Sequence, residues 1–96
     1  MRKKLSGERT NRDVTEWHVY IVRCRNDALY TGVTTDLARR VAEHNAGKGA
    51  RYTRANRPVK LVYSERAESR AQALRRELAI KRFTRGRKLE LIRSQT

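Results

Sequence analysis

One short stretch of the chain contains an arginine and a histidine at the spacing of successive turns of a helix. Arg40 and His44 are four residues apart. On a helical wheel both share a stripe with Leu37 and Val41, whereas Arg39 points away. A guanidinium removed from water needs an anion, because an unpaired buried charge costs several kcal/mol. We therefore expect Arg40 to meet a carboxylate or a bound phosphate, with His44 beside it as a group able to move a proton. A snorkelling arginine and a packed histidine would give the same pattern.

A second helical stretch repeats this arrangement with an acid. Glu77 and Lys81 share a stripe with Leu74 and Leu78, and Arg76 points outward on the same wheel. An i,i+4 pair of this kind is by itself worth only about 0.2–0.5 kcal/mol. Its context is unusual, because the chain has 10 acidic residues against 24 basic ones. Glu77 is therefore a candidate for a role beyond ion pairing.

Two tyrosines fall in neighbouring segments rich in β-branched and aromatic residues. These segments, residues 17–24 and 29–34, are separated by turn-forming residues and are expected to pair as an antiparallel hairpin. Tyr20 and Tyr30 share a face of that hairpin if its register is even-summed, which needs an odd number of loop residues. Gly32 leaves room for a ligand or a backbone to approach closely. A simple packing role would also account for the tyrosines.

The charge of the chain points to a polyanionic partner. The formal net charge is +14 at pH 7. Lys and Arg neutralise phosphates and release condensed counterions, so nucleic acid is the expected partner. Within residues 47–57, basic side chains that could hold phosphates accompany an aromatic one that could stack on a base. The candidate nucleic-acid-binding residues in this segment are Lys48, Arg51, Tyr52, Arg54 and Arg57. The alternative for this segment is a solvated loop.

The remaining patterns predict the elements that would position these side chains. Residues 1–16 are polar and aperiodic, which predicts a flexible basic tail, and residues 17–93 are expected to form one domain. The expected elements are a helix over 37–44 capped by Thr35 or Asp36, a loop over 46–58, a strand over 59–64, a helix over 69–82 and a helix from Thr84 or Arg85 to about Arg93. This order predicts an α+β fold, a three-stranded antiparallel sheet flanked by helices.

Cysteine content and hydropathy bear on the surroundings of the protein. Cys24 is the only cysteine, so neither an intramolecular disulfide nor a cysteine-based metal cluster can form. The basic start lacks the apolar stretch of a secretory signal, and no run is long enough to cross a membrane. We expect a cytoplasmic protein with no membrane partner.

The candidate residues follow one another in the order of a known family. Residues 18–20, His-Val-Tyr, followed by residues 30–32, Tyr-Thr-Gly, resemble the paired GIY and YIG signature of the GIY-YIG nuclease superfamily. Five positions match in order, with the superfamily's spacing in its first helix: Tyr20, Tyr30, Arg40, His44 and Glu77. Residues 36–54 and 57–63 are similar to a subgroup of small stand-alone bacterial proteins, the UPF0213-like proteins. The resemblance covers about Trp17 to Arg93.

The resemblance implies a nuclease that hydrolyses phosphodiester bonds with one divalent metal ion. It implies Glu77 as the metal ligand, Arg40 as a phosphate clamp and His44 as a further catalytic contact. Tyr20 and Tyr30 would orient water or accept its proton. The ion would be Mg²⁺ or Mn²⁺, and a chain so poor in acids suits one ion better than two. The base stays open, because a tyrosine fits the family pattern whereas an ordinary histidine pKa of about 6.5 fits the chemistry.

The same nuclease core occurs in an enzyme that resolves branched DNA, so DNA is favoured over RNA, with a structure-specific role in repair or recombination. Lys81 joins the nucleic-acid-binding candidates. The chain departs from the family pattern at His18 and Thr31, and no Asn follows Asn56, where many members have a supporting one. The alternative is a non-catalytic nucleic-acid-binding module of the same fold, and a third candidate is a ribosome- or protein-associated structural factor. Specificity would come from substrate shape or from a protein partner.

Overall fold

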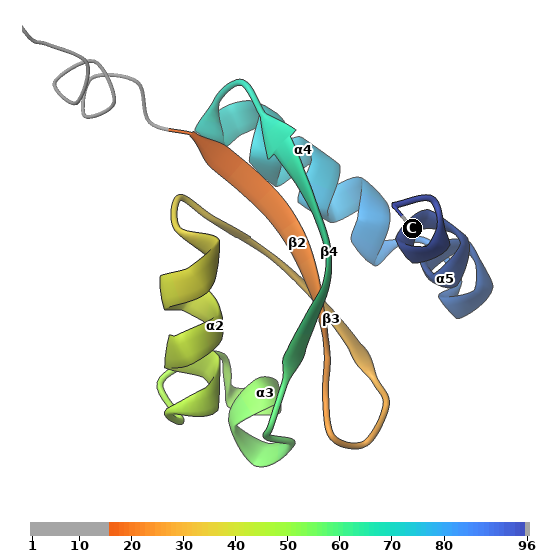
Figure 1. The fold of residues 1–96 in the computed structure, drawn as a ribbon. Coiled ribbons are helices and arrows are strands. Elements are labelled where there is room, and N and C mark those ends of the chain that lie inside the picture. Colours follow the sequence, from red (N-terminus) through yellow and green to blue (C-terminus); the bar gives the residue numbers. More distant parts are fainter. Residues whose placement is uncertain (1–15, 96) are drawn as a thin grey trace, which may run out of the picture.

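The computed structural model describes residues 16–95 and contains three strands and four helices (Figure 1). In chain order these are β2 (Trp17–Arg23), β3 (Leu29–Thr34), α2 (Leu37–Asn45), α3 (Arg51–Ala55), β4 (Lys60–Ala67), α4 (Arg70–Lys81) and α5 (Arg85–Arg93). The expected α+β fold with a three-stranded antiparallel sheet flanked by helices is confirmed. The predicted tail over residues 1–16 lies, apart from Glu16, outside the described residues and stays a prediction.

The sheet has the order β3-β2-β4, so β2 is central and both of its neighbours run antiparallel to it. In the β2–β3 hairpin Tyr20 faces Gly32 and Val22 faces Tyr30. This register is even-summed, as the shared face of the two tyrosines requires. Asp27 adopts a φ of 72° in the connecting turn, a left-handed conformation that Asp tolerates better than most residues.

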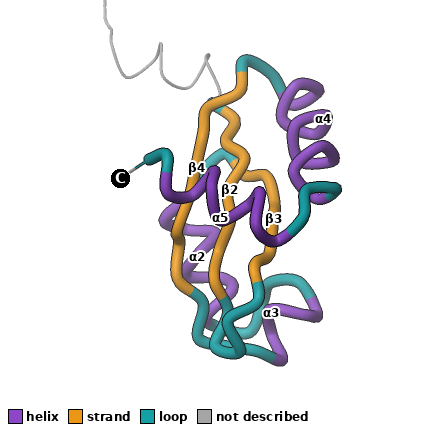
Figure 2. The backbone as a smooth tube through the Cα atoms, turned by 90° about the vertical axis from the view of Figure 1, so that its right-hand side faces the viewer, coloured by secondary structure: helices purple, strands orange, loops and turns teal. Residues whose placement is uncertain are grey.

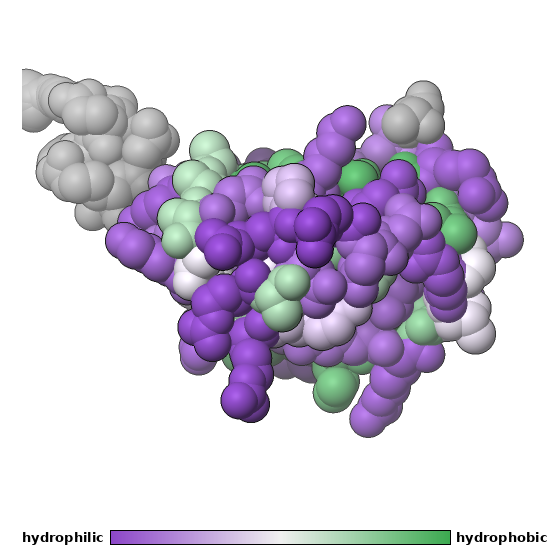
Figure 3. All heavy atoms as spheres, turned by 90° about the horizontal axis from the view of Figure 1, so that it is seen from below, coloured by the Kyte–Doolittle hydropathy of each residue, from purple (hydrophilic) through white to green (hydrophobic). Residues whose placement is uncertain are grey.

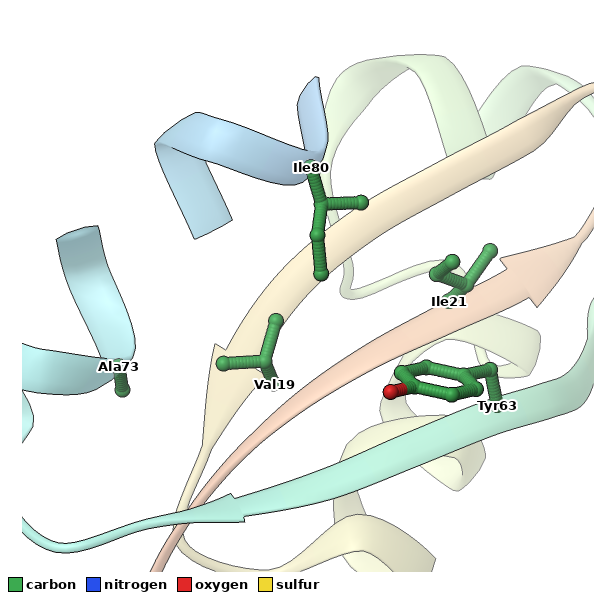
Figure 4. Close-up of a cluster of buried hydrophobic side chains, with 5 residues drawn as sticks. All are labelled: Val19, Ile21, Tyr63, Ala73 and Ile80. Atoms are coloured by element: carbon green, nitrogen blue, oxygen red, sulfur yellow. The ribbon is translucent and has the colours of Figure 1, made fainter. Parts of the chain in front are cut away.

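Each face of the sheet buries its own cluster of side chains, because alternate residues of β2 point to opposite sides. Val19 and Ile21 pack with Tyr63 of β4 and with Ala73 and Ile80 of α4 (Figure 4). On the other face, Tyr20, Val22, Cys24 and Val59 pack against Leu37 and Val41 of α2. Helix α2 and the pair α4–α5 therefore lie on opposite sides of the sheet (Figure 2).

Side-chain caps fix where three of the helices begin. Asp36 accepts a hydrogen bond from the backbone N–H of Arg39, which starts α2. Ser69 starts α4 in the same way, and Thr84 starts α5. These caps satisfy backbone donors that a helix start leaves without partners. The predicted starts of all three helices are confirmed, and Asp36 rather than Thr35 is the first cap.

The segment over residues 46–58 was expected to be a loop, and this prediction is wrong in part, because residues 51–55 form helix α3. The helix is only five residues long and has no side-chain cap. So short a helix gains little from its own hydrogen bonds. Thr53, fully buried, anchors it to α2 instead. Strand β4 is also longer than expected and continues to Ala67.

The inward face of α4 also differs from the one expected. Ala73 and Ile80 are its buried residues, whereas Leu78 is 52% exposed. Arg76 was expected to point outward, yet it is half-buried and donates to Glu65 of β4. The helical wheel placed Leu74 and Leu78 on the buried face, but in the structure Ala73 and Ile80 occupy it.

Candidate active site

A chain of hydrogen bonds crosses the buried side of α2 and joins three elements. The hydroxyl oxygen of Tyr20, in β2, lies 2.8 Å from Nε2 of His44, in α2. On the other side of the ring, Nδ1 of His44 lies 2.8 Å from Oγ1 of Thr53, in α3. His44 and Thr53 are fully buried, and Tyr20 is 1% exposed. Polar groups buried this deeply need partners, and here each has one.

The donors in this chain fix the direction of the hydrogen bonds. Thr53 donates its hydroxyl proton to the carbonyl oxygen of Ala50, 2.9 Å away. Its oxygen must then accept from Nδ1–H of His44, which leaves Nε2 as the acceptor. Tyr20 therefore donates its O–H to His44. Burial lowers the pKa of His44, and the charge of Arg40 lowers it further, so the neutral ring is favoured.

Arg40 closes the other end of the chain. Its Nε donates to the Tyr20 hydroxyl oxygen over 3.3 Å, and its Nη1 donates to Glu43 over 3.1 Å. Burial raises the pKa of Tyr20, and the hydrogen bond from Arg40 opposes that rise. The Arg40 side chain is 30% exposed, and its Nη2 has no protein partner in the described part of the chain. Arg40 thus meets a carboxylate, one of the two anions expected for it, and can still reach an incoming one.

Tyr30 completes the surroundings of the histidine ring. The Tyr20 and Tyr30 rings lie edge-on to His44, with centroid distances of 5.9 and 5.7 Å. Two glycines allow this packing. A Cβ on Gly32 would lie 2.5 Å from the Tyr20 hydroxyl oxygen, and a Cβ on Gly49 would overlap the His44 ring. The site therefore depends on both glycines.

Glu77 lies on α4, which packs against β2 and β3. Its side chain is 19% exposed, and Oε2 lies 3.3 Å from Nζ of Lys81. Its charge raises the pKa of Tyr20 slightly, after the larger effects of burial and Arg40. Among the hydrogen bonds and ion pairs of residues 16–95, none joins Glu77 to the hydrogen-bond network that runs from Arg40 to Thr53. The structure thus brings Tyr20, Tyr30, Arg40 and His44 into contact, and Glu77 lies outside these contacts.

Glu77 offers one carboxylate as a possible ligand for a metal ion. Within residues 16–95, no group of three or more His, Cys, Asp and Glu could hold a metal ion. The second carboxylate oxygen of Glu77 has no protein partner in that range. Mg²⁺ is commonly held by one or two carboxylates, waters and substrate phosphates. Glu77 would be the residue that holds such an ion.

The predicted nucleic-acid-binding residues are spread over the end of the molecule that carries α3 and the β2–β3 turn, except Lys81. That end is covered mostly by hydrophilic residues (Figure 3). Lys48, Arg51, Arg54 and Arg57 are exposed there. Tyr52 is 46% exposed, and its hydroxyl accepts from Asn26 over 2.8 Å. Lys81 lies instead with Glu77 on α4.

Three residues that serve the site were not identified from the sequence. Glu43 pairs with Arg40, and its i,i+3 spacing was a signal that could have revealed it. Thr53 orients His44, and Gly49 makes room for the ring. No local pattern marks these two, because their partner lies in another element.

Comparisons with known proteins agree with this geometry. The family model for the GIY-YIG catalytic domain matches residues 16–90, so the chain belongs to the GIY-YIG family, a superfamily of nucleases that act on nucleic acid. Within the family it is similar to UPF0213 proteins. One from Staphylococcus haemolyticus, SH2523, is 55% identical over 75 residues, which cover 78% of this chain and 92% of the relative. Another from Haloquadratum walsbyi, HQ_3675A, is 53% identical over 79 residues, covering 82% and 89%.

Two solved structures share the fold. The solution structure of the UPF0213 protein BH0048 from Bacillus halodurans is 40% identical, with a TM-score of 0.52, and the match covers 80% of this chain and 82% of that one. The solution structure of EF2693 from E. faecalis is 36% identical, with a TM-score of 0.57, covering 82% and 84%. Among the described residues, no helix is long and apolar enough to span a membrane.

Proposed function

We propose that this protein is a divalent-metal-dependent endonuclease that hydrolyses phosphodiester bonds, with DNA as its preferred substrate and the structure of the DNA as the feature it reads. The observation that carries the proposal is the buried chain from Arg40 through Tyr20 to His44. It combines a cation for phosphate oxygens with an acceptor for a proton. A structural tyrosine would need neither a neutral histidine nor a shared arginine.

In this proposal, Arg40 exchanges its contact with Glu43 for one with the scissile phosphate. The free Nη2 would hold the phosphate in the ground state and stabilise charge on its oxygens in the transition state. Lys and Arg residues around the site would attract the strand, in keeping with the net charge of +14.

The proton of the attacking water would move along the same chain. Tyr20 accepts the water proton while passing its own hydroxyl proton to Nε2 of His44. The proton on Nδ1 of His44 stays there and keeps its hydrogen bond to Thr53. A P–O bond forms to the water oxygen as the P–O bond to the leaving oxygen breaks, and the leaving alkoxide takes a proton from solvent. A divalent cation, when bound at Glu77, would supply positive charge to the phosphate and the leaving oxygen. Tyr30 would orient the water.

The test is cleavage of end-labelled branched, nicked and single-stranded DNA, with matched RNA, in Mg²⁺, Mn²⁺ or EDTA. Glu77→Gln keeps the size of the side chain but removes the anionic ligand, so cutting should fall by about a hundredfold or more, in line with several kcal/mol of transition-state stabilisation. Binding should be kept. Glu90→Gln is the matched control, because Glu90 is an exposed helical glutamate on α5. Cutting that survives EDTA, or equal cutting by Glu77→Gln and the wild type, would exclude the metal-dependent mechanism. Binding of these substrates without cutting would identify a binding module instead.

A further inference from the structure

A basic hollow of about 350 Å³ lies between the end of α2, helix α3 and the segment that leads into β4. It is lined by Arg25, Asn45, Arg54, Ala55, Arg57 and Pro58. Three of these six residues are arginines, and none is acidic. We call this feature the arginine hollow. Its volume is near the lower end of small-ligand pockets, which are about 300–1,000 Å³.

One of the three guanidinium groups is held in place by the backbone. Arg57 donates from Nε to the carbonyl oxygen of Arg54 over 3.1 Å and from Nη1 to that of Asn45 over 3.3 Å. Gly47 makes room for it, because a Cβ there would lie 3.0 Å from Nη1 of Arg57. Nη2 of Arg57 remains available to a ligand. A donor ordered in advance loses less side-chain entropy on binding.

The wall next to Arg57 is also held by hydrogen bonds. The Asn45 side chain donates to the carbonyl oxygen of Val59 over 3.1 Å and accepts from its N–H over 2.7 Å. The backbone N–H of Arg25 donates to the carbonyl oxygen of Asn56 over 2.9 Å, which ties the β2–β3 turn to the end of α3. The hollow is therefore a built feature of the fold rather than a gap between loops.

The other two guanidinium groups have no anion. In residues 16–95, neither Arg25 nor Arg54 makes a side-chain hydrogen bond or an ion pair. The acids near other arginines are already paired, as Glu65 is with Arg76. Like charges around one hollow repel, so an anion that enters it removes an unfavourable interaction. A phosphate suits such a site, because guanidinium groups bind its oxygens with directional, charge-assisted hydrogen bonds.

The hollow shares its framework with the catalytic chain. Asn45 directly follows His44, and Arg54 directly follows Thr53, the two residues joined by the 2.8 Å hydrogen bond. Resting on the proposed function, we propose that the arginine hollow binds one non-scissile backbone phosphate of the substrate strand. That contact fixes the register of the strand relative to Arg40 and Tyr20, while the chemistry stays at the catalytic chain.

The experiment couples the hollow to individual phosphates. Binding of a branched DNA is measured in EDTA, so that no cutting is needed, with a single neutral methylphosphonate placed at each position in turn. The proteins are the wild type, the double variant Arg25→Gln with Arg54→Gln, and a control, Arg75→Gln with Arg82→Gln. The control removes the same charge from two exposed arginines outside the hollow.

We expect one non-scissile position at which the neutral linkage weakens wild-type binding by about tenfold, and the hollow variant by less than twofold. The control variant should keep the full loss at that position. The inference is overturned if every position gives the same loss in the wild type and in the hollow variant. It is also overturned if inorganic phosphate or a nucleoside monophosphate stabilises the wild type, but not the hollow variant, while no strand position couples. Coupling between the hollow and one phosphate position, without cutting in Mg²⁺ or Mn²⁺, would support phosphate binding in the hollow and refute the proposed nuclease activity. Cutting without such coupling would support the nuclease activity and refute phosphate binding in the hollow.

Discussion

The two faces of the sheet each carry an arginine, a tyrosine and a glutamate in contact. On the α4 face, Arg76 donates to both carboxylate oxygens of Glu65, and Tyr63 donates to the same carboxylate. Arg76 also lies over the Phe83 ring, 5.9 Å from its centroid. Burial and Glu65 together raise the pKa of Tyr63 to about 12. In this group the tyrosine keeps its proton and donates it in a hydrogen bond to a carboxylate that the arginine already neutralises.

The group on the α2 face differs in where the tyrosine proton points. Tyr20 donates to the neutral His44 rather than to a carboxylate. Arg40 contacts Glu43 through one nitrogen only and keeps Nη2 free. The same three residue types therefore give a closed structural cluster on one face and an open, proton-accepting one on the other. The two clusters differ because His44 accepts the hydrogen bond from Tyr20 and because the Arg40 guanidinium has a nitrogen without a protein partner.

The largest expected effect separates the two arginines. Arg40→Ala should lower cutting by about a hundredfold or more, because it removes the group proposed to stabilise charge on the phosphate. Arg76→Ala should instead lower the free energy of unfolding by about 1.5–3 kcal/mol, since it removes the charged partner of Glu65 and leaves only the hydrogen bond from Tyr63. Single-turnover cleavage and urea unfolding measure the two effects.

Arg39→Ala is the control for Arg40, because Arg39 is the exposed neighbour on the same helix. It should mainly weaken binding. Equal losses of turnover from Arg39→Ala and Arg40→Ala would remove the distinction between the faces of α2.

A smaller effect is expected at Thr53, which orients the histidine. Thr53→Val removes the oxygen that accepts from Nδ1–H of His44, so the ring loses the interaction that holds its tautomer. Cutting should fall by about tenfold, comparable to the loss when the partner that orients a metal-ligating histidine is removed. Thr53→Ser should restore most of it. If Thr53→Val, still folded, cuts like the wild type, the orientation of His44 has no part in the reaction.

The smallest effect concerns pH. Burial and Arg40 lower the pKa of His44 below its ordinary value of about 6.5. In the proposed mechanism neutral His44 accepts the proton, so cutting should decline only at pH values below the ordinary histidine pKa of about 6.5. The unfolded chain binds the His44 proton more readily, so the contribution of His44 to stability is present above about pH 6.5 and is lost as pH falls through the lowered pKa, with a slope of at most about 1.4 kcal/mol per pH unit.

An NMR titration of the two imidazole rings provides the measurement, with His18→Gln to assign the signals. A His44 pKa above 6.5 would show that the ring is not held neutral.

Local patterns predicted the parts of this fold that local physics decides. The cap at Asp36 and the stripe from Leu37 to His44 follow from one helix alone, and Arg39 is exposed as expected. The shared face of the tyrosines follows from strand register, which an odd hairpin loop sets. The family spacing then identified the four residues that the structure brings into contact.

The features that were missed depend on partners distant in the sequence. Helix α3 is held by the contact between Thr53 and His44, which no propensity reports. Arg76 points inward because it donates a hydrogen bond to Glu65 on β4, eleven residues away in the sequence. Arg25 joins Arg54 and Arg57 only once the β2–β3 turn meets α3. All three features are decided by tertiary contacts between distant segments rather than by the periodicity of the local sequence.

The comparison of the two tyrosines tests the central claim most directly. Tyr20→Phe and Tyr63→Phe each remove one hydroxyl from a buried ring, so their packing effects are matched. Single-turnover cutting of a labelled branched DNA in Mg²⁺ should fall by about a hundredfold or more for Tyr20→Phe, as expected for the loss of general-base catalysis. It should change by less than about twofold for Tyr63→Phe, whose lost hydrogen bond costs only about 0.5–1.5 kcal/mol of stability. Wild-type cutting rates for a folded Tyr20→Phe variant would contradict the claim that the Arg40–Tyr20–His44 chain carries the reaction.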